Sequence, residues 1–141
     1  MKSTLTHIAL HVKDVDACID FYKRYCNMSI CHERHAHGHP VVWLAEPGKE
    51  RQLILVLIPE GEATPHRQED FSHLGFAVLN REAVDTLAAL ALKEGCLRWH
   101  AREAQYPVGY YCGVTDPNGN VVEFSYGQPL GPGALIPDWG L

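Results

Sequence analysis

The chain has 141 residues, of which 46% are hydrophobic, so it is long enough for one compact domain with its own core and leaves little room for a second. Twelve Lys and Arg against seventeen Asp and Glu give a net charge of −5, which argues against a nucleic acid or an anionic membrane surface as a partner. Small molecules and other proteins are the partners that remain.

The N-terminal segment "MKSTLTHIALHV" lacks the continuous apolar region of a secretory signal. No stretch approaches the roughly 20 apolar residues of a membrane span. We therefore expect a cytoplasmic protein. Its five cysteines are an odd number without a CxxC pair, so neither a disulfide framework nor a cysteine zinc site is predicted.

The first half of the chain predicts the element order βαβββ. Residues 5–12 alternate apolar and polar side chains as a strand does, and residues 13–27 carry apolar side chains at helical spacing, with Asp14 as the N-cap. Turns that contain Gly and Pro then separate three predicted strands, at residues 28–35, 40–46 and 51–58.

The second half repeats this order after a polar linker, residues 59–70. A strand is predicted at 72–79 and a helix at 80–95, which Asn80 can cap and Gly95 can end. Three further strands are predicted, with "DPNG" as the last hairpin turn, at residues 96–101, 109–116 and 120–126.

The openings of the two halves, "THIALHVKDVDACIDFY" and "SHLGFAVLNREAVDTLA", align in step and place His7 and His73 at matching positions (73 − 7 = 66 residues). Duplicated modules of this size exist because one alone cannot bury its sheet face. The sequence therefore predicts an α+β fold of two βαβββ modules, residues 5–58 and 71–126, within a single domain, 1–126. A Gly/Pro-rich tail, 127–141, follows, and its Leu135, Ile136 and Trp139 are candidates to dock on a neighbour.

Three polar residues, His7, His73 and Glu123, stand inside otherwise apolar strands. A buried carboxylate without a counter-charge is costly, and two imidazoles with one carboxylate are a standard set of divalent-metal ligands. Each residue taken alone is better explained by exposure to solvent or by an ordinary hydrogen bond than by a metal. The matching positions of the two histidines in the repeat favour a shared metal.

With these modules and the closing motif "GVTDPNGNVVEFSYG", roughly residues 5–126 resemble the vicinal oxygen chelate superfamily. That superfamily contains glyoxalase I, extradiol dioxygenases, fosfomycin resistance enzymes and bleomycin resistance proteins. The resemblance implies a cupped, incompletely closed mixed sheet and a divalent metal of the Fe, Mn or Zn class that chelates two adjacent oxygens of a small substrate. The metal ligands of the family map onto His7, His73 and Glu123, and Glu123 is also a candidate catalytic proton acceptor. The resemblance further implies a homodimer, in which His7 of one chain meets His73 and Glu123 of the other.

Each specialised signature of the superfamily is broken in this chain. The fourth metal ligand of glyoxalase I falls on Leu55, so a typical glyoxalase I is not expected. The assisting Tyr of extradiol dioxygenases and fosfomycin transferases falls on Gly113, and the hydroxyl residue of the latter falls on Ala9. The interpretation that remains is a metal-dependent enzyme of dioxygenase or isomerase/lyase type whose reaction is unassigned.

The alternative is a metal-free protein that sequesters a ligand between aromatic side chains, as the bleomycin resistance members do. Five aromatic residues are candidates to line such a cleft: Trp43, Trp99, Tyr106, Tyr110 and Tyr111. Because the binding proteins generally lack the metal ligands and this chain retains all three, the enzyme is the preferred interpretation.

The stretch "HERHAHGHP", residues 32–40, holds four of the nine histidines. It spans the end of a strand, a turn at Gly38 and the start of the next strand at Pro40. Histidines on turns usually face water, so we expect His35, His37 and His39 to be solvated rather than to form the metal site.

Overall fold

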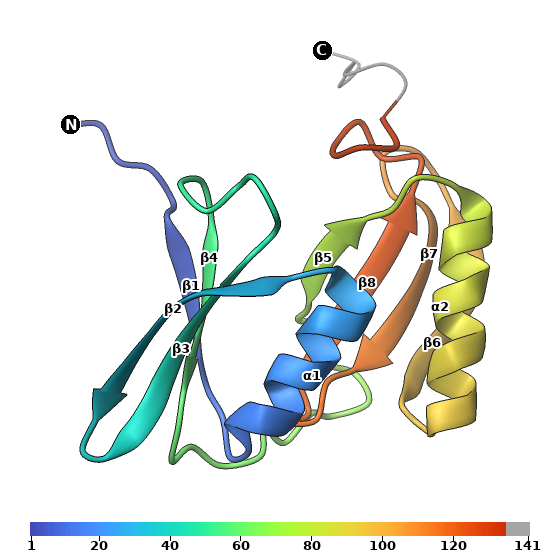
Figure 1. The fold of residues 1–141 in the computed structure, drawn as a ribbon. Coiled ribbons are helices and arrows are strands. Elements are labelled where there is room, and N and C mark those ends of the chain that lie inside the picture. The colour runs from blue at the N-terminus through green and yellow to red at the C-terminus, as the bar shows by residue number, and fades with distance from the viewer. Residues whose placement is uncertain (135–141) are drawn as a thin grey trace. The chain divides into compact units, whose positions relative to one another are not determined.

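The computed structural model describes residues 1–134 and consists of two compact units, Met1–Pro65 and His66–Leu141. Each unit has the predicted order βαβββ and contains one mixed four-stranded sheet (Figure 1), which confirms the α+β modules. Leu135, Ile136 and Trp139, for which docking is expected, lie outside the described residues.

The first unit forms a sheet in the order β1-β4-β3-β2, in which β1 runs parallel to β4 and the other neighbours are antiparallel. Asp14 caps the helix as predicted, because its side chain accepts a hydrogen bond from the Ala17 N–H at 3.0 Å. The elements are β1 (His7–His11), α1 (Val15–Cys26), β2 (Ser29–Ala36), β3 (His39–Ala45) and β4 (Ile54–Ile58).

The second unit forms a sheet in the order β5-β8-β7-β6, with β5 parallel to β8. Asn80 caps its helix through the Ala83 N–H, and Gly95, at φ 76°, ends it, both as predicted. The elements are β5 (Leu74–Ala77), α2 (Arg81–Glu94), β6 (Leu97–Ala104), β7 (Gly109–Thr115) and β8 (Val121–Tyr126).

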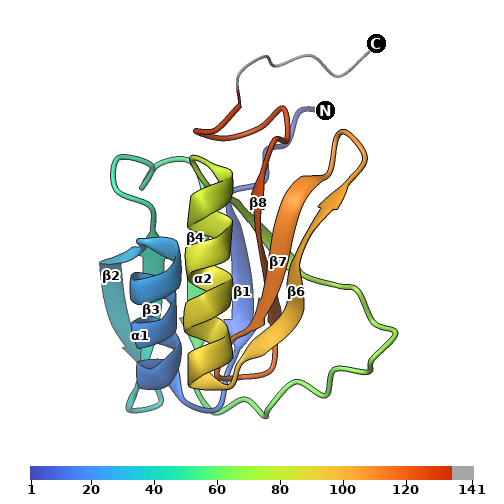
Figure 2. The same cartoon turned by 90° about the vertical axis from the view of Figure 1, so that its right-hand side faces the viewer.

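Helix α2 covers one face of the second sheet (Figure 2) and contacts β6, β7 and β8. Its buried residues Val84, Ala88 and Ala91 provide the apolar side of this contact. The Cys112 thiol of β7 donates to the Val84 carbonyl at 3.8 Å, and burial raises its pKa to about 12. This thiol is therefore a packing residue of the core rather than a nucleophile.

The turn between β7 and β8 is built on Asp116, which is 3% exposed. Its Oδ1 accepts the backbone N–H groups of Asn118 and Asn120 at 2.8 and 2.9 Å, and its Oδ2 accepts from the Asn120 side chain at 3.2 Å. The predicted "DPNG" turn is thus present, and it fixes the register of β8.

Several strand ends differ from the prediction. β4 begins at Ile54 rather than at residue 51, because residues 50–52 form a turn. β5 is limited to Leu74–Ala77, so His73 directly precedes the strand. β6 continues to Ala104 rather than ending at residue 101, because Arg102, Glu103 and Ala104 pair with β7. Among residues 1–134, no helix is long and apolar enough to cross a membrane.

Candidate metal centre

His73 and Glu123, two of the three predicted ligands, are in direct contact. The His73 Nε2 atom lies 2.7 Å from the Glu123 Oε2 atom. Glu123 lies opposite Gly75 in the parallel pair of β8 and β5, and His73 lies two residues before Gly75. Since side chains alternate along a strand, His73 and Glu123 project to the same face of the sheet. The strand register therefore brings together two residues that are distant in the sequence.

The His73 ring is held by its other nitrogen. Its Nδ1 atom lies 2.6 Å from the carbonyl oxygen of Phe71. Because a carbonyl only accepts, Nδ1 carries a proton, and the imidazole presents Nε2 to Glu123. A metal-ligating histidine usually donates its other ring N–H to a carbonyl or carboxylate, which fixes the orientation of the ring, and the Nδ1–H of His73 does this.

Glu123 is 7% exposed and occupies the middle of β8. Burial raises the pKa of its carboxyl above the usual range, because the charged form loses its hydration, and the neighbouring His73 opposes this increase. At 2.7 Å the pair shares a proton between Nε2 and Oε2. A divalent cation that replaced this proton would gain one nitrogen and one carboxylate oxygen as ligands, so the two residues fit a metal of the Fe, Mn or Zn class.

His7, the third predicted ligand, belongs to the other unit. It is the first residue of β1, is exposed, and its Nδ1 lies 3.0 Å from the Thr6 hydroxyl. Within the part of the chain that the structure describes, no three His, Cys, Asp or Glu side chains gather into a metal-binding cluster. The structure thus brings together His73 and Glu123 within the second unit, and His7 belongs to the first unit.

The two units also show which residue of β4 corresponds to Glu123. Ala9 pairs with Val56 in β1 and β4, as Gly75 pairs with Glu123 in β5 and β8. The first unit therefore has the apolar Val56, 7% exposed, where the second has a carboxylate. The sequence comparison placed the missing fourth ligand at Leu55, one residue earlier, and neither residue can bind a metal.

Trp99 of β6 explains the glycine at position 113. The two residues are paired across β6 and β7, and a Cβ on Gly113 would clash with the indole of Trp99. The same indole meets the His73 ring edge-on, with ring centroids 5.5 Å apart. The space that a tyrosine would take in a dioxygenase signature is thus filled by a tryptophan from the neighbouring strand.

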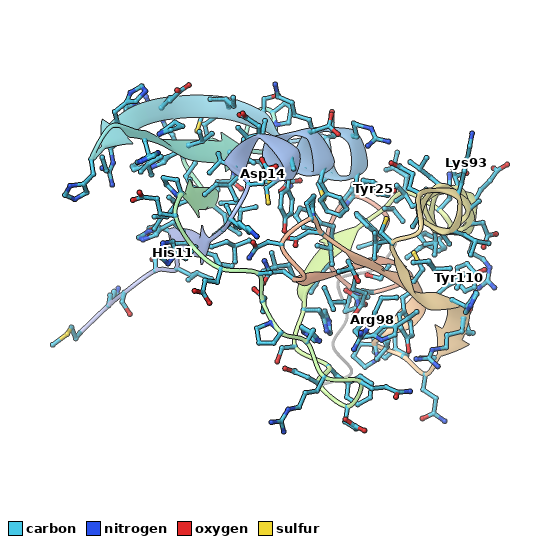
Figure 3. The ribbon with its side chains drawn as sticks, turned by 90° about the horizontal axis from the view of Figure 1, so that it is seen from below. His11, Asp14, Tyr25, Lys93, Arg98 and Tyr110 are labelled. Atoms are coloured by element: carbon cyan, nitrogen blue, oxygen red, sulfur yellow. The ribbon has the colours of Figure 1, made fainter. Side chains whose placement is uncertain are left out.

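The other candidate aromatic residues are divided between different surfaces. Tyr111 lies on the Glu123 side of the sheet and contacts Trp99, with ring centroids 6.4 Å apart. Tyr110 instead lies on the side of α2, where its hydroxyl donates to Asp85 (Figure 3). Tyr106 is exposed in the β6–β7 turn, and Trp43 belongs to the first unit. Tyr110 is therefore not part of an aromatic cleft with Trp99, contrary to the sequence-based expectation.

The histidine-rich stretch is solvated, as predicted. His32, His35, His37 and His39 are all exposed. His37 and Gly38 form the turn between β2 and β3, with φ values of 53° and 82°, and the His39 Nε2 pairs with Glu60 at 3.0 Å. Both side chains of the His39–Glu60 pair are exposed, whereas the Glu123 partner of His73 is buried.

The sequence profile of the Glyoxalase/Bleomycin resistance protein/Dioxygenase superfamily matches residues 4–124. The chain belongs to this superfamily. The uncharacterized protein PA2024 of Pseudomonas aeruginosa is 55% identical to the superfamily member described here over 134 residues, which are 95% of this chain and 96% of that protein.

Solved structures show the same fold at low sequence identity. A mutant of the fosfomycin resistance protein FosX from Listeria monocytogenes, in complex with Mn(II) and 1S,2S-dihydroxypropylphosphonic acid, has a TM-score of 0.70. It is 20% identical, over 96% of this chain and 94% of that chain. The trypanothione-dependent glyoxalase I of Leishmania major has a TM-score of 0.64 and 20% identity, over 89% of this chain and 88% of that chain.

Proposed function

We propose that this protein is a divalent-metal-dependent enzyme that acts on a small substrate chelated through two adjacent oxygens. His73 and Glu123 hold the metal together with His7. The observation that carries this proposal is the contact of the His73 Nε2 with the buried Glu123 carboxylate at 2.7 Å, with Nδ1 anchored on a backbone carbonyl. An ordinary surface histidine needs none of these features.

A divalent cation held at these residues supplies a Lewis acid that stabilises an oxyanion on the substrate. The chain's own residues do the rest. Glu123 is also the candidate proton acceptor, through the carboxylate oxygen that is not bound to the metal. The indole of Trp99 packs edge-on against the His73 ring and helps to hold its orientation.

The reaction is of dioxygenase or isomerase/lyase type. A typical glyoxalase I is disfavoured, because Val56 and Leu55 of β4 are buried and apolar and offer no fourth ligand. The metal belongs to the Fe, Mn or Zn class, because two imidazoles and one carboxylate suit each of these ions. The location that we propose is the cytoplasm.

The proposal is tested by metal analysis of protein purified from metal-replete medium. We expect stoichiometric divalent metal in the wild type. His73→Ala and Glu123→Ala should lose at least about tenfold in metal affinity, since even second-shell changes cost about 10- to 100-fold. The matched control replaces His35, His37 and His39 together by Asn, which should leave the metal content unchanged.

Two results would contradict the metal site. One is a wild-type protein without stoichiometric metal. The other is loss of metal in the triple Asn variant together with full retention in His7→Ala. Circular dichroism and gel filtration on every variant separate a lost ligand from a lost fold.

A metal-free ligand-sequestering protein is the second candidate function. The rings of Phe71, Trp99 and Tyr111, which lie together around Trp99, favour it. Binding of an aromatic ligand to wild type and to His73→Ala decides between the two functions. A ligand-sequestering protein would bind the ligand equally well with or without His73.

We further propose that the protein is a homodimer in which the partner's His7 completes each site. The two metal-ligating parts of the repeat belong to different compact units, which fits an exchange of units between two copies.

A further inference from the structure

Arg102 lies on the face of the second sheet that carries Glu123. One row of paired residues crosses β6, β7 and β8 through Trp99, Gly113 and Glu123. The next row crosses the same strands through Arg102, Tyr111 and Ser125. These two rows are parallel lines across the same face. Ideal sheet spacings place the backbone positions of Arg102 and Glu123 about 12 Å apart.

The Arg102 guanidinium is oriented but not neutralised. Its Nε donates to the Tyr111 hydroxyl oxygen at 2.8 Å, and its Cζ lies 5.4 Å from the centre of the Tyr111 ring. Among residues 1–134 it has no carboxylate partner, and the neighbouring Glu103 pairs with Arg81 instead. Arg102 is exposed, so both Nη groups are available to a ligand.

Tyr111 adds a second donor at the same place. Because its oxygen accepts the Arg102 Nε–H, its own O–H is available to donate outward. A guanidinium and a hydroxyl that converge in this way suit the oxygens of a carboxylate, phosphonate or phosphate.

Aromatic rings cover the face between the metal ligands and Arg102. Trp99 contacts His73 at a centroid distance of 5.5 Å and Tyr111 at 6.4 Å, in edge-on geometry in both cases. Phe71, which is 63% exposed, contacts Trp99 at 6.1 Å. A flat apolar group of a ligand would pack on these rings.

We infer that the substrate is an organic anion with a flat apolar middle, whose oxyanion binds Arg102 and Tyr111 while its two adjacent oxygens reach the metal. Arg102 is then a specificity-determining residue. The inference rests on the proposed function only for the end of the substrate that binds the metal. The anion site, Arg102 and Tyr111, is built from β6 and β7 alone.

The anion site is tested first on metal-free protein, by calorimetric titration with phenylphosphonate and, as the neutral comparison, benzyl alcohol. We expect wild type to prefer phenylphosphonate. Arg102→Gln should weaken phenylphosphonate binding about tenfold or more and leave benzyl alcohol unchanged. Tyr111→Phe, which keeps the ring, should cause a smaller loss. The matched control is Lys93→Gln, which removes one positive charge from α2 on the other face of the sheet (Figure 3) and should have no effect.

The second titration uses Mn(II)-loaded protein with catechol and 3,4-dihydroxybenzoate, which differ by one carboxylate. Wild type should bind 3,4-dihydroxybenzoate about tenfold more tightly, and Arg102→Gln should abolish this preference while keeping the affinity for catechol. If phenylphosphonate binding is insensitive to Arg102→Gln, the anion site is wrong. If instead Mn(II) does not bind, or does not improve catechol binding, the proposed function fails and the metal-free titration still decides the anion site.

Discussion

The hydrogen bond from His73 Nδ1 to the Phe71 carbonyl determines which nitrogen of the imidazole faces Glu123. It fixes the tautomer, so that Nε2 is directed at Glu123 at 2.7 Å. Glu123 is buried, and its pKa is raised mainly by loss of hydration. In the absence of metal the pair therefore stores a proton, and metal and proton compete for the same two atoms.

Replacing Glu123 by Gln should stabilise the metal-free protein at neutral pH. The raised pKa means that the native state holds a proton in a pH range in which the unfolded chain has already released it, so stability falls as pH rises from the usual value of 4.5 through the raised one. Gln carries no charge and avoids this loss. We expect a Tm higher by roughly 3 °C at pH 7, since about 1 kcal/mol has that effect in a chain of this length.

Thermal unfolding in EDTA, followed by circular dichroism at several pH values, checks this prediction. The difference between Glu123→Gln and wild type should vanish below pH 4.5, where the carboxyl is neutral in both states. A variant that is less stable than wild type at neutral pH would show that the His73 contact outweighs the loss of hydration.

At this scale the sequence identified the pair of residues in contact, His73 and Glu123, better than their surroundings. His73 and Glu123 stand out because polar side chains among apolar strand residues need partners. Arg102 gives no such signal, because it lies in "WHAREA", where polar residues are frequent, and the expected strand ended at residue 101. Its position next to Tyr111 depends on the pairing of β6 with β7.

At the scale of elements, the turn between β7 and β8 positions Glu123, the proposed metal ligand, which follows Asn120 by three residues. Asp116 holds this turn through both carboxylate oxygens, with acceptor contacts of 2.8 to 3.2 Å. Since Gly113 and Glu123 are paired, a slip of the turn would move the carboxylate to the face covered by α2.

Asp116→Ala should lower the free energy of unfolding by about 2 to 4 kcal/mol, because it leaves two buried or half-buried N–H groups without an acceptor. Urea denaturation measures the loss. Asp116→Asn retains one acceptor oxygen and should cost less than half as much. A loss below about 0.5 kcal/mol in Asp116→Ala would mean that the turn forms without this side chain.

Helix ends were predictable and strand ends were not, for a physical reason. A cap such as Asp14 or Asn80 is decided within four residues of sequence, and both caps form the expected hydrogen bonds. The end of a strand depends on its neighbour. β6 reaches Ala104 because Gly109 of β7 pairs with it, which no local pattern in residues 102–104 reveals.

At the scale of the whole molecule, duplication has produced two units of the same order with different chemistry. The second unit has His73 and Glu123, whereas the first has His7 and, at the position that corresponds to Glu123, Val56. The repeat and the family were predictable from the sequence, because aligned openings and the "DPNGNVVEF" motif are local. The proposed meeting of His7 with the other two residues depends on assembly, on which residue patterns carry no information.

Mixing two inactive variants tests the proposed exchange of units. In a dimer of one His7→Ala chain and one His73→Ala chain, one site receives both mutations and the other receives none. The mixed dimer, isolated with two different tags, should therefore regain about half of the metal of wild type, as measured by elemental analysis. Each variant alone should stay largely metal-free, and a metal-free mixed dimer would mean that all three ligands come from one chain.

The edge-on contact of Trp99 with the His73 ring has a consequence for how the protein can be observed. A paramagnetic ion such as Mn(II) or Fe(II) bound at the proposed site would quench the fluorescence of this indole, whereas Zn(II) would not. The chain has three tryptophans, and the other two, Trp43 of β3 and Trp139, can be replaced by Phe. The protein thus contains its own optical reporter for the proposed metal site, which would also distinguish a paramagnetic ion from Zn(II).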